Sequence, residues 1–261
     1  MIMTGYDIDI IKNLAIQAGQ AIMKIYETDF QVETKQDNSP LTLADITANE
    51  IIVQGLKENF PDYAILSEEA KDDKSRLSNH NCFIVDPLDG TKEFLKKNDQ
   101  FTVNIALSHQ HKPVLGVIYV PVTKQLYYAY KSLGAYLENS ETGEVNKLSV
   151  SNKTHNLIMV GSKSHSSEKE ENLKKEHQKF ILKTISAGSS LKGCMIAEGK
   201  ADVYYRFGLT CEWDTAAMQC IVEEAGGIFR QMDGSEMMYN RENTLNEKGF
   251  FVVNKKENIW I

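Results

Sequence analysis

The chain has 261 residues, of which 42% are hydrophobic and 25% are charged, and its formal net charge is −7. This length and apolar content suit one large globular domain or two closely packed halves. The negative charge argues against a nucleic-acid polymer as a partner, because proteins that bind the phosphate backbone usually present a basic surface. A small anionic ligand would need a local source of positive charge, such as bound divalent cations.

Membrane spans, secretion signals and disulfide frameworks are not expected. No run of about eighteen apolar residues occurs, so we predict no transmembrane segment. The start of the chain, residues 1–7, lacks the basic and then apolar regions of a secretory signal. We therefore expect a cytoplasmic protein, with peripheral contact to the inner face of the cell membrane as an alternative. The four cysteines are scattered and contain no C-x-x-C pair.

The first half of the chain, residues 1–150, is predicted to be an α+β unit. Apolar residues at helical spacing indicate a long amphipathic helix within the first thirty residues. A second helix is expected from Thr42, which can cap it, to about residue 59. These helices should pack on a large mixed or antiparallel sheet. Its strands are predicted at 64–67, 82–86, 101–108, 114–120, 125–130 and 135–138.

The second half, residues 151–261, alternates between strands and helices, which is typical of a layered α/β unit. The charged run 168–176 indicates the solvated face of a helix. Strands are predicted at 157–161, 181–185, 201–206, 227–230 and 249–253, and helices at 167–180, 190–198 and 214–225.

Two acids, Asp86 and Asp89, follow the apolar run of a predicted buried strand. Pro87 favours an extended backbone before it and Gly90 permits a tight turn, so both carboxylates can converge on one point. A helix that opens at Thr91 would offer unpaired amides to a phosphate. The alternative is that these acids only cap a turn and a helix, which is common.

Three further segments carry acids that can complete such a site. Glu68 and Glu69 follow the predicted strand 64–67, Asp214 opens an apolar helix, and Asp45 lies at the start of the second helix. Each has a structural alternative, as a surface pair, a helix cap or a capping box. Together they form a set of oxygen ligands of the kind that Mg²⁺ prefers, and four or five acids suit two or three ions.

These motifs, in this order, resemble the signatures of the inositol monophosphatase superfamily of magnesium-dependent, lithium-sensitive phosphatases, and the resemblance covers nearly the whole chain. It implies an α/β (α+β) fold arranged as a layered αβαβα sandwich. Within the superfamily, segments 37–45, 101–107 and 188–192 resemble the 3′(2′),5′-bisphosphate nucleotidases. Glu93 favours the nucleotidases, because inositol monophosphatases more often carry Thr-x-Asn-Phe after the glycine of the turn.

The resemblance implies a role for each matching position. Asp45 and Thr91 would orient and deprotonate the attacking water, and Glu68 is the third implied catalytic residue. Lys192 would supply a cation for the nucleotide or its second phosphate. The implied metal ligands are Glu68, Asp86, the backbone carbonyl of Leu88, Asp89 and Asp214, with two ions and a third, weaker one near Glu68. The implied substrate contacts are Leu88, Asp89, Gly90, Thr91, Gly188, Ser189, Ser190, Lys192 and Asp214.

The activity that follows from the resemblance is hydrolysis of adenosine 3′,5′-bisphosphate to AMP and phosphate, a reaction of sulfur metabolism. The first alternative is an inositol or sugar monophosphatase, and the second is a non-catalytic, metal-binding regulatory protein. Two segments depart from the family pattern. These are Cys211 with Glu212, which lie beside Asp214, and the short polar stretch 71–79, which we expect to be a mobile loop. The sequence sets no oligomeric state.

Overall fold

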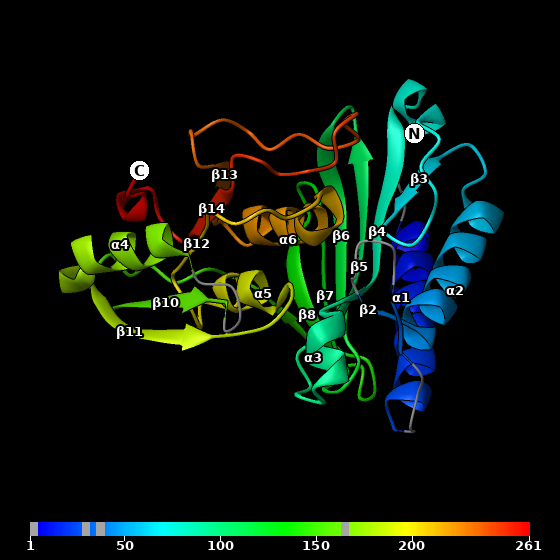
Figure 1. Cartoon of the computed structure of the whole chain (residues 1–261), viewed down its shortest axis with the longest axis horizontal. Helices are drawn as coiled ribbons and strands as arrows, with labels where there is room; N and C mark the ends of the chain where they lie inside the picture. The colour runs from blue at the N-terminus through cyan, green and yellow to red at the C-terminus, as the bar shows by residue number, and fades with distance from the viewer. Residues whose placement is uncertain (1–4, 28–31, 35–39, 163–166) are drawn as a thin grey trace.

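The computed structural model describes residues 5–27, 32–34, 40–162 and 167–261. Their helices and sheets stack in five layers, which confirms the expected αβαβα sandwich (Figure 1). Helices α1 (Gly5–Tyr26) and α2 (Leu43–Asn59) form the outer layer of the first half. The predicted stripe of α1 lies in the core, since Ile11, Ala15 and Ile22 are fully buried. Helix α2 begins after Thr42, and the predicted cap by the Thr42 side chain lies outside the described side chains.

A seven-stranded sheet forms the second layer, in the order β3-β4-β5-β6-β7-β8-β9. Strands β3 and β4 are parallel and the other pairs are antiparallel, so the sheet is mixed, as expected. Strand β9 and the hairpin of β1 (Val32–Thr34) and β2 (Pro40–Thr42) were not predicted. The strands are β3 (Ala64–Ser67), β4 (Asn81–Asp89), β5 (Thr102–His109), β6 (Lys112–Val120), β7 (Gln125–Tyr130), β8 (Gly134–Asn139) and β9 (Val145–Lys147).

Strand β4 corrects one prediction, because it does not end at Asp86 but continues through the acidic turn to Asp89. Asp86 pairs with Asn104 of β5, whereas Asp89 pairs with Thr102. Three steps along β4 therefore face two steps along β5, which is the signature of a bulge with one extra residue. Without the bulge, residues three apart would point to opposite faces of the sheet. The extra residue lets both carboxylates lie on the same face.

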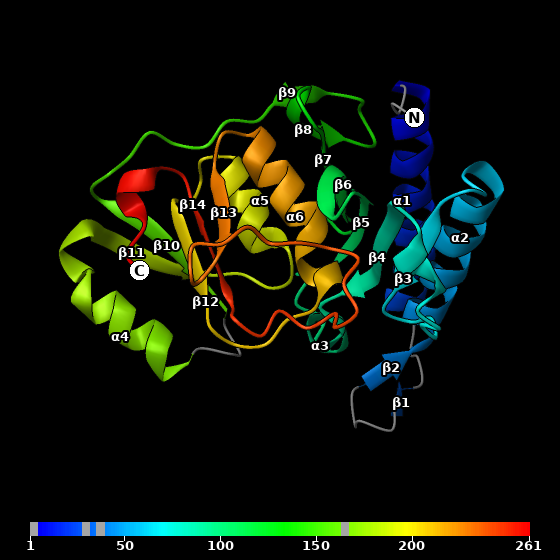
Figure 2. The ribbon, with the colours of Figure 1, turned by 90° about the horizontal axis from the view of Figure 1, so that it is seen from above.

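The second half supplies the other three layers. Helices α5 (Leu191–Ala197) and α6 (Glu212–Glu224) lie between the two sheets, and α4 (Glu168–Glu176) covers the far sheet (Figures 1 and 2). Helix α4 is shorter than predicted, because a separate 3₁₀ turn spans Gln178–Phe180. The far sheet has the order β11-β10-β12-β14-β13. Its strands are β10 (Leu157–Gly161), β11 (Ile181–Ser186), β12 (Val203–Arg206), β13 (Ile228–Gln231) and β14 (Phe250–Val253).

Helix α6 joins the two halves, because it packs directly on the seven-stranded sheet. A Cβ atom at Gly116 of β6 would lie 2.5 Å from the carbonyl oxygen of Ala217, so only glycine permits this approach. The core between the sheets contains residues of both halves, including Ile84, Ile118 and Ile221. The division of the chain at residue 150 therefore stays a proposal, although the strands of the two sheets do not intermix along the sequence.

Two further features of the described residues concern location and thiol chemistry. In the described ranges, no helix combines the length and apolar character needed to cross a membrane. The four cysteines are free thiols, and Cys82, Cys194 and Cys220 are buried.

Candidate active site

Carboxylate oxygens of Asp86, Asp89 and Asp214 lie within 4.8 Å of one another. The first two come from the bulge of β4, and Asp214 comes from the first turn of α6 in the other half of the chain. The Asp214 side chain also accepts a hydrogen bond from the amide of Cys211, which fixes it at the start of the helix. The sequence predicted these three acids as one set, and the structure brings them together.

Burial raises the free energy of the charged form of these carboxylates. Asp86 is 1% exposed, and burial raises its pKa well above the usual range, as do the nearby carboxylates, of which Glu68 has the largest effect. Asp45 also raises this pKa, so both predicted partners act on Asp86. Burial, followed by the charge of Asp89, raises the pKa of Asp214 to about 7. Converging carboxylates of this kind suit a divalent cation, which would compensate their charge.

Asp89 is held by a chain of polar side chains on β5 and the loop before α5. Its Oδ2 accepts hydrogen bonds from Ser190 Oγ at 2.8 Å and from Asn104 Nδ2 at 3.2 Å. Asn104 also donates to Ser190 Oγ at 2.9 Å, and its Oδ1 accepts from Thr102 Oγ1 at 2.9 Å. Thr102 and Asn104 are buried, and no role was predicted for either of them. The available signal was two polar residues within the apolar run 101–107.

The turn after Asp89 meets the loop before α5. Gly90 has a φ of +97°, and a Cβ atom there would lie 3.1 Å from the carbonyl oxygen of Gln100 and 3.3 Å from the Cβ of Ser189. Gly188 approaches the same carbonyl, and its amide donates to Gln100 Oε1 at 2.9 Å. Helix α3 (Thr91–Leu95) follows the turn as predicted, and Thr91 Oγ1 donates to the carbonyl of Leu88 at 3.4 Å. The two predicted substrate segments are therefore in contact.

The sequence profile of the inositol monophosphatase family matches residues 6–259. The chain belongs to this family. The CysQ 3′(2′),5′-bisphosphate nucleotidase of Salmonella typhimurium is 42% identical, with 92% of this chain and 96% of that protein covered. The enzyme of the same name from Escherichia coli K12 is 40% identical, with 94% and 98% covered. The crystal structure of CysQ from Bacteroides thetaiotaomicron has a TM-score of 0.83 and 39% identity, and covers 96% of this chain and 98% of that one. The resemblance inferred from the motifs is confirmed.

Lys192, which the resemblance offers as the cation for the nucleotide or its second phosphate, is buried. It is 7% exposed, and its Nζ donates to the carbonyl oxygens of Ser189 at 2.6 Å and Ala187 at 3.4 Å. Burial lowers its pKa, while the charge of Asp89 opposes that effect. Lys192 thus supports the 187–190 loop from inside the protein, and its contact with a second phosphate stays a prediction. Ser190 is also buried, and it donates to Asp89 rather than facing solvent.

Arg206, the last residue of β12, is a cation near the site that the sequence analysis missed. Its charge lowers the pKa of both Asp214 and Lys192, so it lies within electrostatic reach of the acidic cluster. The side chain is half-buried. A single arginine at the end of a strand carries no recognisable pattern, so only the fold brings it to the site.

The two segments that depart from the family pattern are joined through Asn240 and Arg241. Glu212 is fully buried, and its carboxylate accepts hydrogen bonds from the amides of Asn240 and Arg241. The mobility expected for 71–79 stays a prediction, but Arg76 within this segment is 4% exposed and donates to Asn240 Oδ1 at 2.8 Å. A 3₁₀ turn, Ser75–Ser78, forms part of this segment.

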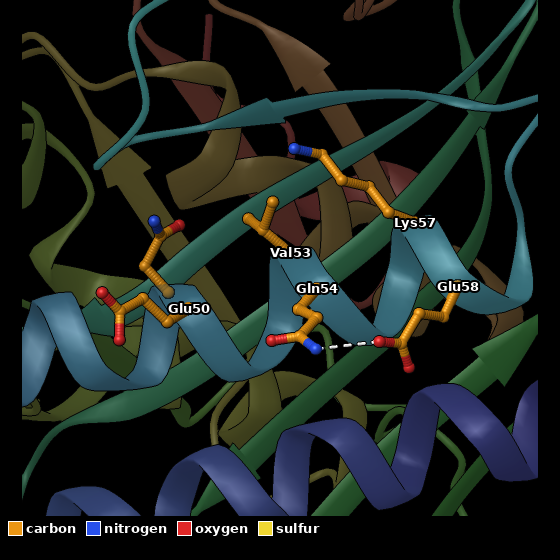
Figure 3. A pocket seen from close by; sticks show the side chains of 6 residues that line it. Glu50, Val53, Gln54, Lys57 and Glu58 are labelled. Atoms are coloured by element: carbon orange, nitrogen blue, oxygen red, sulfur yellow. Dashed lines mark hydrogen bonds between the residues drawn. The ribbon is translucent and has the colours of Figure 1, made fainter.

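A separate hollow of about 490 Å³ lies along the outer face of α2 (Figure 3). Gln54 Nε2 donates to Glu58 Oε1 at 2.8 Å along the helix. None of the predicted site residues lines this hollow. The candidate active site is therefore a different place, where the carboxylates of Asp86, Asp89 and Asp214 converge. The lining residues are Asn49, Glu50, Val53, Gln54, Lys57 and Glu58.

Proposed function

We propose that the protein is a magnesium-dependent phosphatase that hydrolyses adenosine 3′,5′-bisphosphate to AMP and inorganic phosphate. The observation that carries the proposal is the convergence of the Asp86, Asp89 and Asp214 carboxylates within 4.8 Å. Relatives named as 3′(2′),5′-bisphosphate nucleotidases, at 40–42% identity over nearly the whole chain, support the substrate class. The cytoplasmic location expected from the sequence stays a prediction.

The proposed cofactor is Mg²⁺, as two ions with a third, weaker one near Glu68. The raised pKa values of Asp86 and Asp214 support this proposal, because in the described structure like charges converge on one point. Bound Mg²⁺ would neutralise the substrate phosphate and lower the pKa of a coordinated water. It would also explain how a chain with a net charge of −7 accepts a polyanion. The proposed ligands are Glu68, Asp86, the carbonyl of Leu88, Asp89 and Asp214.

Asp45, Glu68 and Thr91 are the proposed catalytic residues. Asp45 is buried and its charge raises the pKa of Asp86, which supports the proposal that Asp45 acts as the proton acceptor. The Thr91 hydroxyl, near the carbonyl of Leu88, would orient the attacking water toward that acceptor. Because phosphoryl transfer requires little covalent chemistry from the protein, these residues would act by positioning and charge.

The substrate is proposed to lie across the two loops that meet at Gln100. The turn 88–91 would hold the scissile phosphate, with its backbone amides as donors, and the loop 188–190 would contact the nucleotide. We add Arg206 to the predicted contacts, because a second phosphate requires a nearby cation and Lys192 is engaged with carbonyl oxygens. The predicted contacts are Leu88, Asp89, Gly90, Thr91, Gly188, Ser189, Ser190, Lys192 and Asp214.

Phosphate release in the presence of Mg²⁺ tests this function directly. We expect faster turnover of adenosine 3′,5′-bisphosphate than of inositol 1-phosphate. The reverse order would favour an inositol or sugar monophosphatase with the same metal site. An Asp89→Asn variant should lose activity with both compounds. Turnover equal to that of the wild type in this variant would instead favour a protein whose acids serve only structure or regulation.

A further inference from the structure

Glu212 is the first residue of α6 and lies two residues before Asp214. Its Oε2 accepts a hydrogen bond from the amide of Asn240 at 2.6 Å. Its Oε1 accepts from the amide of Arg241 at 2.9 Å and from Arg241 Nε at 3.2 Å. A fully buried carboxylate requires such partners. Glu212 therefore attaches the loop at 240–241 to the start of α6.

The same loop holds the first turn of α6 through a second residue, Asn246, which is 1% exposed. Asn246 Nδ2 donates to the carbonyl of Cys211 at 2.8 Å and to Thr215 Oγ1 at 3.2 Å. Its Oδ1 accepts from Arg241 at 2.7 Å, so the two attachments are joined. The residues on both sides of Asp214 are thereby fixed to the loop.

The segment 232–249, between β13 and β14, reaches from the far sheet across α6 to the seven-stranded sheet (Figure 2). There, Asn240 Oδ1 accepts from Arg76 at 2.8 Å, and the carbonyl of Arg241 accepts from Arg76 at 2.9 Å. Arg76 also donates to Asp72 at 2.8 Å. Asp72 and Arg76 lie four and eight residues after Glu68. These hydrogen bonds therefore join the start of α6, which carries Asp214, to the segment that follows Glu68.

We propose that Glu212 is a positioning residue that, through Asn240 and Arg76, fixes Asp214 relative to Glu68 and so preorganises the metal site. This inference rests on the proposed magnesium-dependent function. The two acids come from different halves of the chain and both raise the pKa of Asp86, so repulsion between like charges opposes the ligand geometry. Rigid supporting contacts around metal ligands offset such repulsion before the metal binds.

The test is Mn²⁺ binding to the metal-free full chain, measured by titration calorimetry together with the melting temperature. Glu212→Ala should weaken Mn²⁺ binding by about tenfold or more. Glu224→Ala is the matched control at the other end of α6, since its carboxylate oxygens accept from the amides of Ser132 and Gly134, each at 2.9 Å. This control should lower the melting temperature and leave Mn²⁺ affinity unchanged.

Asn240→Gly keeps the test decisive if Glu212→Ala does not fold. Asn240 has a φ of +56°, which glycine adopts without strain, so this variant removes mainly the side-chain link to Arg76. It should also weaken Mn²⁺ binding. The positioning role alone would be overturned if Mn²⁺ affinity were unchanged in Asn240→Gly and in folded Glu212→Ala but reduced in Asp214→Asn. Unchanged affinity in Asp214→Asn would instead overturn the proposed metal site.

Discussion

The hydroxyl of Ser190 donates a hydrogen bond of 2.8 Å to Oδ2 of Asp89, which joins the loop before α5 to the bulge in β4. Ser190→Ala removes this bond and leaves Asn104 as the remaining donor, at 3.2 Å. We expect metal affinity to fall about tenfold, because supporting hydrogen bonds orient carboxylate ligands. Titration of the metal-free chain with Mn²⁺ measures the effect. Ser149→Ala, at an exposed position, is the control, and equal affinities in the two variants would contradict the prediction.

Asp214→Asn should make the metal-free protein more stable while abolishing its activity. The variant keeps an oxygen for the amide of Cys211 but removes a charge from the buried cluster. The folded pKa of Asp214, about 7, lies above the unfolded value of about 3.9. The folded state therefore binds more protons between these values, and its stability falls as pH rises through them.

This linkage fixes how the stability difference depends on pH. In urea unfolding of the metal-free chains, the free energy of unfolding of Asp214→Asn should rise relative to that of the wild type between about pH 5 and pH 8. The expected rise is on the order of 2 kcal/mol. Excess Mg²⁺ should reverse the order, because it stabilises only the form that binds it. A stability difference that does not vary with pH would argue against the raised pKa.

Gly90→Ala should reduce activity by more than its loss of stability explains. A φ of +97° is strained for alanine, and the added methyl group would crowd the carbonyl of Gln100 at 3.1 Å. Gly234→Ala is a matched control, since Gly234 has a φ of +80° and nothing lies within 4 Å of its Cβ position. Both variants should lose about 1 kcal/mol of unfolding free energy. Only Gly90→Ala should lower kcat, by at least about tenfold, and equal kcat values would contradict the proposed phosphate turn.

Arg206→Met should raise KM for adenosine 3′,5′-bisphosphate about tenfold, because we place Arg206 near the second phosphate. KM for a nucleoside 3′-monophosphate should change much less, since that compound has no second phosphate. Arg230→Met removes a half-buried arginine that pairs with Glu223 at 2.7 Å, away from the acidic cluster, and serves as the control. A parallel rise in KM for both compounds would show that Arg206 does not discriminate between them.

The sequence by itself determined the local pattern of this protein. Helical spacing predicted α1, apolar runs predicted β3, β7 and β10 with their observed bounds, and the acids at 86, 89 and 214 were predicted as one set. The helix and strand bounds depend on neighbours within a few residues, which periodicity and turn chemistry report directly. The three acids were grouped by their ligand chemistry and by the family motifs. The family motifs added the layered fold.

The tertiary structure decided everything that depends on contacts between distant segments. The bulge in β4 follows from its pairing with β5, and it places Asp86 and Asp89 on one face. Lys192 looked available as a cation, yet packing buries it against two carbonyl oxygens. Glu212 and Arg76 looked like departures from the pattern, and they join through Asn240, which lies 164 residues from Arg76 along the chain. Burial and long-range pairing are properties of the fold, so no local pattern reports them.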